Sequence, residues 1–431
     1  MNRRTELAFL VGAAALVGFG TAFVNLSRAE SVDAEVGLSV LVFGLAFLSL
    51  RAAIGAFAPK GTRHPIVISA ALSAIGFIEV YRLDPTLAGR QRWWFLVAAA
   101  VASGVLFLLR DVGLDILRRY RYLVLVSTLG LLALPLFPLE GPLPLRGRLV
   151  NGSRLWVEVG YEPATVGFQP GELAKLLLVA FLAAYLADHA KDLAGGGRRL
   201  GWLHVPAPRQ LLPVAVAWAA SFLVLVVQRD LGASMLLLAV FVALVYAATG
   251  QAFHLAAGAG LFLVGGVAAW FAFDHAQTRV QAWLDPFGDP FGAGYQIVQG
   301  IFAMGSGSLT GAGLGLGRPD LIPFAATDFI YAAIGEELGL AGSVVVLALF
   351  GLLIAAGAGI ALRARNPFRS LLAAGLTFIL GIQVILIVGG VVRLLPLTGI
   401  TLPFMSYGGS SLVANMILIA LLARVSHEEA G

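Results

Sequence analysis

The sequence predicts an all-helical protein that crosses a membrane many times, and three observations support this prediction. Hydrophobic residues make up 59% of the 431 residues and charged residues only 12%, and the mean hydropathy is +0.89. A soluble domain has about 25% charged residues. The apolar residues gather in runs of about 17–25 residues, the length that an α-helix needs to span a bilayer. One helical bundle is therefore favoured over several domains.

Twelve such runs follow one another along the chain. They cover roughly residues 6–26, 37–57, 66–82, 92–109, 123–139, 171–187, 211–228, 232–249, 254–273, 339–361, 370–392 and 406–424. The seventh and eighth share one long apolar stretch, which only residues 228–230 interrupt. The first run follows Arg3 and Arg4 without a clear small-residue cleavage site. We therefore interpret it as a retained anchor rather than a removed signal peptide.

The distribution of lysine and arginine predicts the orientation of these spans. An even number of spans puts both termini on one side, and that side carries 16 Lys and Arg residues against 11 on the other. The positive-inside rule then places both termini in the cytoplasm and loops 140–170 and 274–338 outside. We expect a multi-pass protein of the cytoplasmic (inner) membrane whose larger surface chemistry is extracytoplasmic. Nucleotide cofactors are scarce there, and no glycine-rich phosphate-binding motif follows a strand.

The residue inventory argues against several kinds of chemistry. The chain has no cysteine, which excludes disulfides and thiolate chemistry. Its six histidines are scattered without metal-ligand spacing, which argues against a zinc site. The basic pI of about 9.7 is explained by positive cytoplasmic loops rather than by nucleic-acid binding.

Residues 274–337 form the one long stretch that cannot lie in a membrane. The stretch contains 11 glycines, two Asp-Pro-Phe-Gly turns and two arginines, Arg279 and Arg318. Seven of the 24 acidic residues lie in it: Asp274, Asp285, Asp289, Asp320, Asp328, Glu336 and Glu337. Polar residues at the edge of a hydrocarbon core are costly, so they indicate function. Segment 297–304 is too short to span and is predicted to be a re-entrant or surface element. The glycine-rich loop 300–317 is predicted to be too mobile to hold a catalytic geometry unaided.

Asp328 has two interpretations. As a helix N-cap, its carboxylate would accept backbone N–H bonds. Such bonds stabilise the charged form and would make it a weak general base. As a catalytic base, it needs burial or neighbouring acids to offset this effect. Residue type alone leaves both interpretations open.

A second constellation opens the sixth span. Pro170 suits the first helical turn, and Glu172 stands where a carboxylate favours the helix dipole. Lys175 is three residues further on and shares the same helix face. Because Lys175 lies inside an apolar run, it needs a partner or a cavity. The pair either fixes helix packing or lines a cavity for an anionic substrate.

Asp230 and Arg154 also have a structural and a functional interpretation. Asp230 either pairs with Arg229 in a polar hairpin or points into the same cavity as Lys175. Arg154, close to Trp156, is either an interfacial anchor or a phosphate clamp that uses its planar guanidinium. Motifs 396–399 and 402–411 are predicted to be mostly structural, because small residues allow close helix packing.

Together and in this order, these motifs resemble the SEDS family of cell-wall proteins, whose members include FtsW and RodA. The resemblance runs from about residue 66 to 424. It depends on residues 169–172 with Lys175, 230–232, 289–296, 327–329 with 336–339, and 402–411. The variant at 389–399 is similar to actinobacterial RodA-like members. Departures are Phe324 and Ala326, where the family often has Glu and His, Gly171, where Ser is usual, and Ile387, where Asn is usual.

The resemblance implies a ten-helix core at 66–424, a two-helix extension at 1–65 and a cytoplasmic tail at 425–431. It implies an inverting glycosyltransferase that polymerises lipid II outside the cytoplasmic membrane, for elongation or division. The other substrate would be an undecaprenyl-pyrophosphate-linked glycan. The implied partners are a class B penicillin-binding protein, which cross-links the strands, and membrane lipids.

The resemblance also assigns roles to single residues. Asp328 falls on the family's catalytic aspartate and Asp320 on a second functional acid. The polar cavity residues fall on Arg154, Glu172, Lys175 and Asp230. A divalent cation, Mg or Mn, on the acidic loop stays open. Two other functions are alternatives: a lipid II flippase needs the cavity but no base, and a non-catalytic scaffold for a penicillin-binding protein needs neither.

Overall fold

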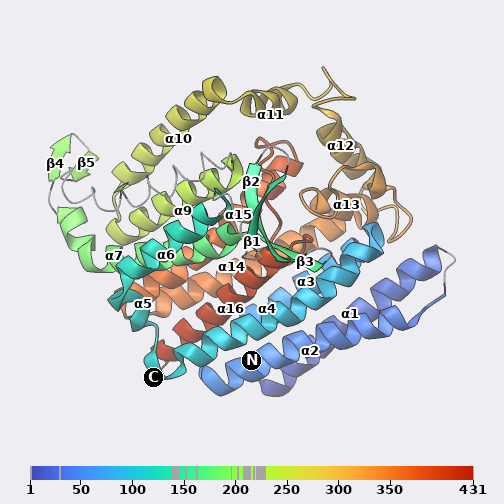
Figure 1. Cartoon of the computed structure of the whole chain (residues 1–431), viewed down its shortest axis with the longest axis horizontal. Coiled ribbons are helices and arrows are strands. Elements are labelled where there is room, and N and C mark those ends of the chain that lie inside the picture. The colour runs from blue at the N-terminus through green and yellow to red at the C-terminus, as the bar shows by residue number, and fades with distance from the viewer. Residues whose placement is uncertain are drawn as a thin grey trace. The chain divides into compact units, whose positions relative to one another are not determined.

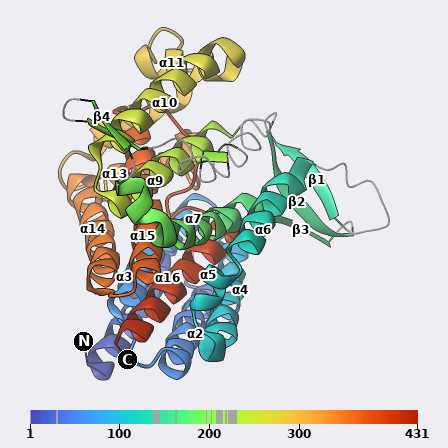
Figure 2. The ribbon, with the colours of Figure 1, turned by 90° about the vertical axis from the view of Figure 1, so that its left-hand side faces the viewer.

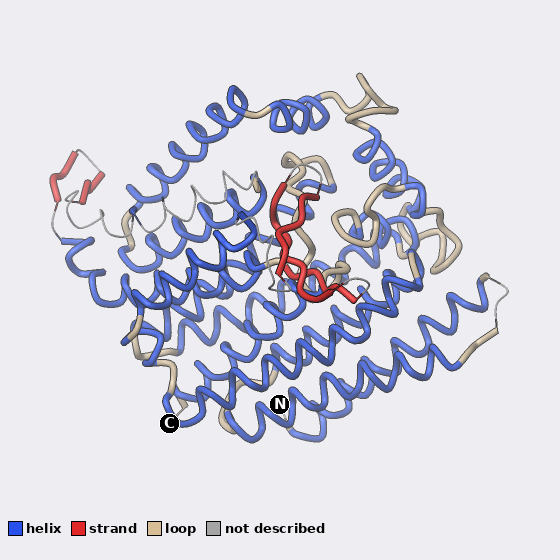
Figure 3. The backbone as a smooth tube through the Cα atoms, in the orientation of Figure 1, coloured by secondary structure: helices blue, strands red, loops and turns tan. Residues whose placement is uncertain are grey.

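The computed structural model describes residues 2–28, 31–136, 145–150, 153–161, 164–195, 197–200, 203–206, 215–216, 219 and 230–430. Within these residues helices predominate, and strands are confined to two small sheets (Figure 3). The described residues include ten helices that are long and apolar enough to cross a membrane. The predicted polytopic helical architecture is therefore confirmed.

Ten of the predicted spans coincide with long helices. These are α1 (Arg3–Ser27), α2 (Ala34–Phe57), α3 (His64–Leu83), α4 (Pro85–Val112), α7 (Pro170–Gly195), α9 (Leu231–Thr249), α10 (Ala252–Ala272), α14 (Gly339–Arg363), α15 (Pro367–Val391) and α16 (Gly409–Glu429). The predicted fifth span, 123–139, corresponds to α6 (Arg121–Ala133) and the 3-10 helix η1 (Leu134–Leu136), and its last three residues lie outside the described residues. The seventh predicted span, 211–228, lies almost entirely outside the described residues.

The chain forms two compact units that alternate along the sequence. The first unit comprises Met1–Phe107, Ala268–Ala356 and Gln383–His427. The second comprises Leu108–Val267, Gly357–Ile382 and Glu428–Gly431. The boundaries expected at residues 65 and 424 stay a prediction.

In the first unit the N-terminal helices pack against the helix that follows them. Helices α1, α2 and α3 lie side by side (Figure 1). Phe43 of α2 contacts Phe95 of α4 edge-on and Phe47 of α2 contacts it at a tilt, with ring centroids 5.1 and 6.1 Å from that ring. At the far end of α1, the Tyr81 hydroxyl donates to Asn25 Oδ1 at 2.9 Å. Aromatic contacts and a buried hydrogen bond thus tie the two extra helices to α3 and α4.

The stretch 274–337 is more helical than the sequence indicated. It contains α11 (Asp274–Leu284), α12 (Tyr295–Gly307), the 3-10 helix η2 (Pro319–Leu321) and α13 (Ile330–Glu337). The two Asp-Pro-Phe-Gly turns connect α11 and α12. In these turns Asp285 accepts from the Gly288 N–H at 3.1 Å and Asp289 from the Ala293 N–H at 2.8 Å. The short element predicted at 297–304 corresponds to α12, which packs against α13.

The second unit contains the strands, which the sequence did not predict. Helices α6 and α7 pack along each other, and α5 (Asp115–Arg119) precedes them. Strands β1 (Leu145–Val150), β2 (Ser153–Tyr161) and β3 (Ala164–Phe168) form an antiparallel sheet beside α6 (Figure 2). A second hairpin joins β4 (Gly197–Leu200) and β5 (Leu203–Pro206). Strand β2 has nine residues and alternates Leu155, Val157 and Val159 with Arg154 and Glu158, so the strand signal was present and the all-helical prediction missed it.

Candidate functional site

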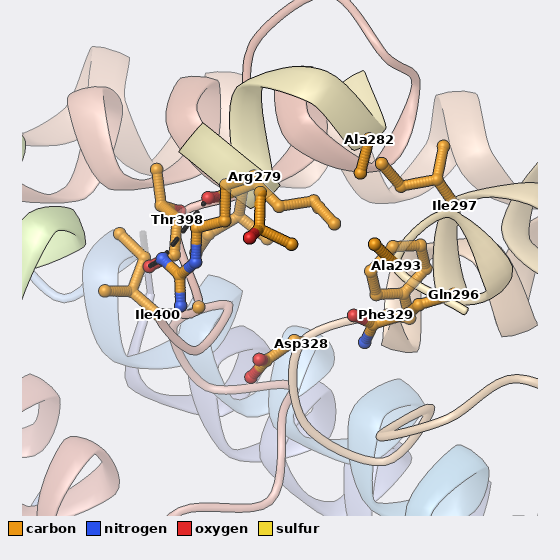
Figure 4. Close-up of a pocket in the computed structure, with 13 residues that line it drawn as sticks. Arg279, Ala282, Ala293, Gln296, Ile297, Asp328, Phe329, Thr398 and Ile400 are labelled. Atoms are coloured by element: carbon orange, nitrogen blue, oxygen red, sulfur yellow. Dashed lines mark hydrogen bonds between the residues drawn. The ribbon is translucent and has the colours of Figure 1, made fainter. Parts of the chain in front are cut away.

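The first unit contains a small pocket whose lining combines one carboxylate and one guanidinium group. Its volume is about 120 Å³. It lies among α11, the start of α12, the residues before α13 and the segment after α15 (Figure 4). The polar part of the lining comprises Thr278, Arg279, Gln296, Asp328 and Thr398. Asp328 and Arg279 are the only charged residues that line it.

A tight turn places Asp328 in this pocket. Phe324 adopts a left-handed conformation with φ +57°, and its carbonyl accepts from the Asp328 N–H at 3.0 Å. The turn is anchored from the 402–407 segment, where the Ser406 hydroxyl donates to the Thr327 carbonyl at 2.5 Å and the Tyr407 N–H to the Ala326 carbonyl at 2.8 Å. A left-handed non-glycine residue costs about 1–3 kcal/mol, so these contacts are needed to hold the turn.

Asp328 does not cap a helix. Helix α13 begins at Ile330, its N-cap residue is Phe329, and no side chain accepts a capping hydrogen bond there. The capping interpretation is therefore wrong. The reason is local: the helix starts two residues later, so the Asp328 carboxylate is left to face the pocket.

The surroundings of Asp328 tune its acidity. Burial raises the pKa of the Asp328 carboxyl to about 6, because removal from water disfavours the charged form. A hydrogen bond from the Thr327 side chain and the positive charge of Arg279 act against this rise in pKa. A carboxylate with a pKa near the working pH is suited to general base catalysis.

Arg279 faces Asp328 from α11 (Figure 4). Its Nη1 donates to the carbonyl oxygens of Leu397 and Thr398, at 3.4 and 3.2 Å. The next residue, Gly399, has φ +70°, and a Cβ atom added there would lie 3.3 Å from Arg279 Nη2 and 3.8 Å from Asp328 Oδ2. Sequence reasoning missed Arg279 as a site residue. The available signal was its place as one of two arginines in the acidic stretch.

The glycine-rich loop after α12 is held by buried carboxylates. Glu337 Oε2 accepts from the Gly315 N–H at 2.8 Å, and Glu336 Oε1 from the Arg318 N–H at 2.7 Å. Glu337 also pairs with Arg82 at 2.9 Å. The prediction that loop 300–317 is too mobile to hold a catalytic geometry unaided stays a prediction. Residues 300–307 belong to α12, and hydrogen bonds to Glu337 and Glu336 hold the segment that follows.

Four predicted site residues lie in the second unit. Lys175 is buried, and its Nζ lies 2.8 Å from Glu172 Oε2. Asp230 caps α9, because its side chain accepts from the Ala233 N–H at 2.9 Å. Arg154 is exposed on β2. The Glu172–Lys175 pair agrees with its structural interpretation, the cap by Asp230 is a role that the sequence did not predict, and the functional roles stay predictions. Residue 229, the expected partner of Asp230, lies outside the described residues.

Among the described residues, the remaining acids do not gather into a metal centre. Asp320 is exposed in η2 and does not line the pocket. In the part of the chain that the structure describes, no group of three or more His, Cys, Asp or Glu residues could hold a metal ion. The residue positions therefore give no support to the Mg or Mn alternative, and no step below depends on a metal.

Known proteins share both this sequence and this fold. A family model described as a cell cycle protein, FtsW/RodA/SpoVE, matches residues 35–431. The chain is 40% identical over 442 residues to a Mycobacterium tuberculosis protein named peptidoglycan glycosyltransferase RodA, covering 99% of this chain and 91% of that one. It is 33% identical to stage V sporulation protein E of Bacillus subtilis, covering 84% and 95%.

Solved structures give the same picture. One chain from a work on structural coordination of polymerization and crosslinking by a peptidoglycan synthase complex matches with a TM-score of 0.68 and 29% identity, covering 86% of this chain and 98% of that one. The rod shape determining protein RodA of Thermus thermophilus matches with a TM-score of 0.58 and 26% identity, covering 86% and 98%. The fold and the relatives define a multi-pass membrane glycosyltransferase of peptidoglycan synthesis. The chain belongs to the FtsW/RodA/SpoVE family, which confirms the resemblance drawn from its motifs.

Proposed function

We propose that this protein is an inverting glycosyltransferase that polymerises lipid II on the outer face of the cytoplasmic membrane. The observation that carries the proposal is the buried carboxyl of Asp328, which lines the pocket. Its pKa of about 6 suits a general base. Relatives over nearly the whole chain are named peptidoglycan glycosyltransferases, which supports the same reaction. The excess of Lys and Arg on the side of the termini supports cytoplasmic termini and an outward pocket.

In the proposed reaction the 4-hydroxyl of one lipid II attacks the anomeric carbon of a lipid-linked glycan. Asp328 accepts the hydroxyl proton as the oxygen forms its bond to that carbon. The bond to the pyrophosphate breaks on the opposite side, so the configuration inverts and undecaprenyl pyrophosphate leaves. General base catalysis of this kind contributes about 10²–10⁴-fold to the rate.

Other residues are proposed to bind the charged parts of the substrates. Arg154 is exposed, so its guanidinium is accessible to a phosphate group. Lys175 would act as one half of a pair with Glu172, stabilising the leaving pyrophosphate electrostatically. Asp230 and Asp320 remain proposed substrate-binding residues.

The proposed partner is a class B penicillin-binding protein. Support comes from the matched solved structure, whose subject is the coordination of polymerization and crosslinking by a synthase complex. Such a partner would cross-link the strands that this chain makes. Stimulation by a variant of the partner without its active-site serine would indicate a conformational effect rather than a chemical one.

The test is to incubate the purified protein with lipid II, with and without the partner, and to separate the products by gel electrophoresis. Wild-type protein should make glycan polymer, and Asp328→Asn should make almost none. A flippase would transport lipid II without polymer, and a scaffold would do neither. Absence of polymer from the wild type in the presence of its partner would refute the proposed function.

A further inference from the structure

Arg279 and Asp328 face each other across the pocket without forming an ion pair. Each of the ion pairs found within the described residues joins other side chains. The Nη1 of Arg279 donates hydrogen bonds to the carbonyl oxygens of Leu397 and Thr398. Its Nη2 makes no hydrogen bond with the described residues and lies beside Gly399. One donor therefore remains available on the side of the guanidinium nearest to Asp328.

Gly399 keeps a small space between the two charges. Its φ of +70° is a conformation that favours glycine, and the position of its missing Cβ is 3.3 Å from Nη2 and 3.8 Å from Asp328 Oδ2. No ion pair joins the two side chains, so these two atoms are more than 4.0 Å apart, and their distances to the Cβ position keep them within about 7 Å of each other. One substrate oxygen in this gap can lie between a donor on one side and an acceptor on the other. A hydroxyl group fits such a place, because it accepts one hydrogen bond and donates another.

The geometry of inversion indicates which substrate supplies this hydroxyl. The general base lies about 2.6–3.2 Å from the oxygen it deprotonates. That oxygen lies about 3–3.5 Å from the carbon it attacks, and the leaving oxygen is beyond the carbon. The pyrophosphate is thus about 6 Å or more from the base. Because Arg279 Nη2 and Asp328 Oδ2 both lie beside Gly399, the guanidinium is on the side of the attacking sugar.

On the basis of the proposed glycosyl transfer, we propose that Arg279 binds the attacking hydroxyl of the acceptor sugar and orients it against Asp328. Nη2 donates to the hydroxyl oxygen while the hydroxyl donates to Oδ2. As its proton moves to Asp328, the oxygen bonds to the anomeric carbon, and the electrons of the broken bond leave with undecaprenyl pyrophosphate. The guanidinium of Arg279 stabilises the charge that develops on the attacking oxygen.

The experiment follows the titration of Asp328 by carbodiimide labelling and mass spectrometry in the full-length protein. Arg279→Gln removes the only other charge that lines the pocket from α11, α12, the 328–329 turn and the 397–400 segment. We expect the labelling midpoint to move to higher pH in this variant. Arg318→Gln is the matched control, because Arg318 is exposed in the same acidic stretch and should leave the midpoint unchanged.

Protection by lipid II tests the binding step without turnover. Lipid II should protect Asp328 from labelling in the wild type, and Arg279→Gln should need about 10- to 100-fold more lipid II, the range expected for one charge-assisted hydrogen bond. Arg279→Lys keeps the charge but loses the planar fork, so its midpoint should stay while protection weakens.

The opposite results would overturn the inference. If Arg279→Gln shows an unchanged labelling midpoint and full protection, Arg279 only holds the 397–398 carbonyls in place. This conclusion holds even if the melting temperature of the variant falls. If the wild type makes no polymer, but Arg279→Gln still shows the shifted midpoint and the weaker protection, the proposed function is refuted and binding of the acceptor by Arg279 is supported.

Discussion

The Nε of Arg82 lies 2.9 Å from Oε1 of Glu337, and both side chains are buried. This pair connects the end of α3 to the end of α13, the helix that begins just after Asp328. Arg82 Nη2 also donates to the Gly317 carbonyl at 2.9 Å. The residues that position the pocket are thus supported by a charged pair outside it. Arg28, the residue that follows the extra helix α1, contacts this support by donating to the Arg82 carbonyl.

The Arg82–Glu337 pair is expected to be essential for stability. Arg82→Met leaves the buried Glu337 without its cation, and breaking a buried pair costs about 3–5 kcal/mol. We expect a marked fall in the melting temperature of the detergent-solubilised protein and a loss of polymer. The double variant Arg82→Met with Glu337→Leu should recover much of the stability. A melting temperature unchanged by Arg82→Met would show that the pair is not needed.

Asp328→Asn is expected to separate catalysis from folding. The amide keeps the shape of the side chain but cannot accept the proton, so polymerisation should fall by about 10²–10⁴-fold. Because Asp328 does not cap α13, no capping energy is lost, and because the amide removes a buried charge, the melting temperature at neutral pH should be no lower than that of the wild type. Lipid II polymerisation and thermal unfolding are measured on the same preparation. Near-normal polymer from Asp328→Asn would contradict the role of a base.

The pH dependence of the rate should follow the ionisation of Asp328. The base works only when ionised, so the rate should fall as the pH is lowered through about 6. The stability of the fold changes with pH in the opposite direction to the rate. A carboxyl whose pKa rises on folding contributes stability that is lost as the pH rises from about 4 to about 6. Wild type should therefore lose stability relative to Asp328→Asn across this window. A rate that stays constant down to pH 5 would contradict the assignment.

The membrane spans could be predicted from the sequence because a bilayer demands long apolar helices. Shorter elements could not. The strands of residues 145–168 and the helix α12 are too short to span a bilayer, so a search for long apolar runs passes over them even though β2 alternates apolar and polar residues. The seven acids of 274–337 suggested a polar loop, but Glu336 and Glu337 instead fold into α13 and bind backbone amides.

The candidate site could be predicted only in part, and sequence separation explains the limit. Glu172 and Lys175 are three residues apart on one helix, so their pairing follows from local geometry. Asp328 could be selected by residue type and motif. Arg279 and Gly399 are 120 positions apart, and only the folded chain brings them to the same pocket. No local pattern carries that information.

Lys175 is expected to be both structural and functional, and a double-variant cycle separates the two roles. Lys175→Met strands Glu172, whose side chain is mostly buried at the start of α7. The helix dipole partly stabilises the remaining carboxylate, so we expect a loss of about 2–4 kcal/mol rather than the largest values for broken pairs. Glu172→Gln with Lys175→Met removes both charges and should regain most of this stability. If lipid II binding, measured by fluorescence with labelled lipid, stays weak in the stable double variant, Lys175 or Glu172 contacts the substrate. If binding returns with stability, the pair acts only through packing. A single variant Lys175→Met with wild-type stability and weak binding would contradict the structural role.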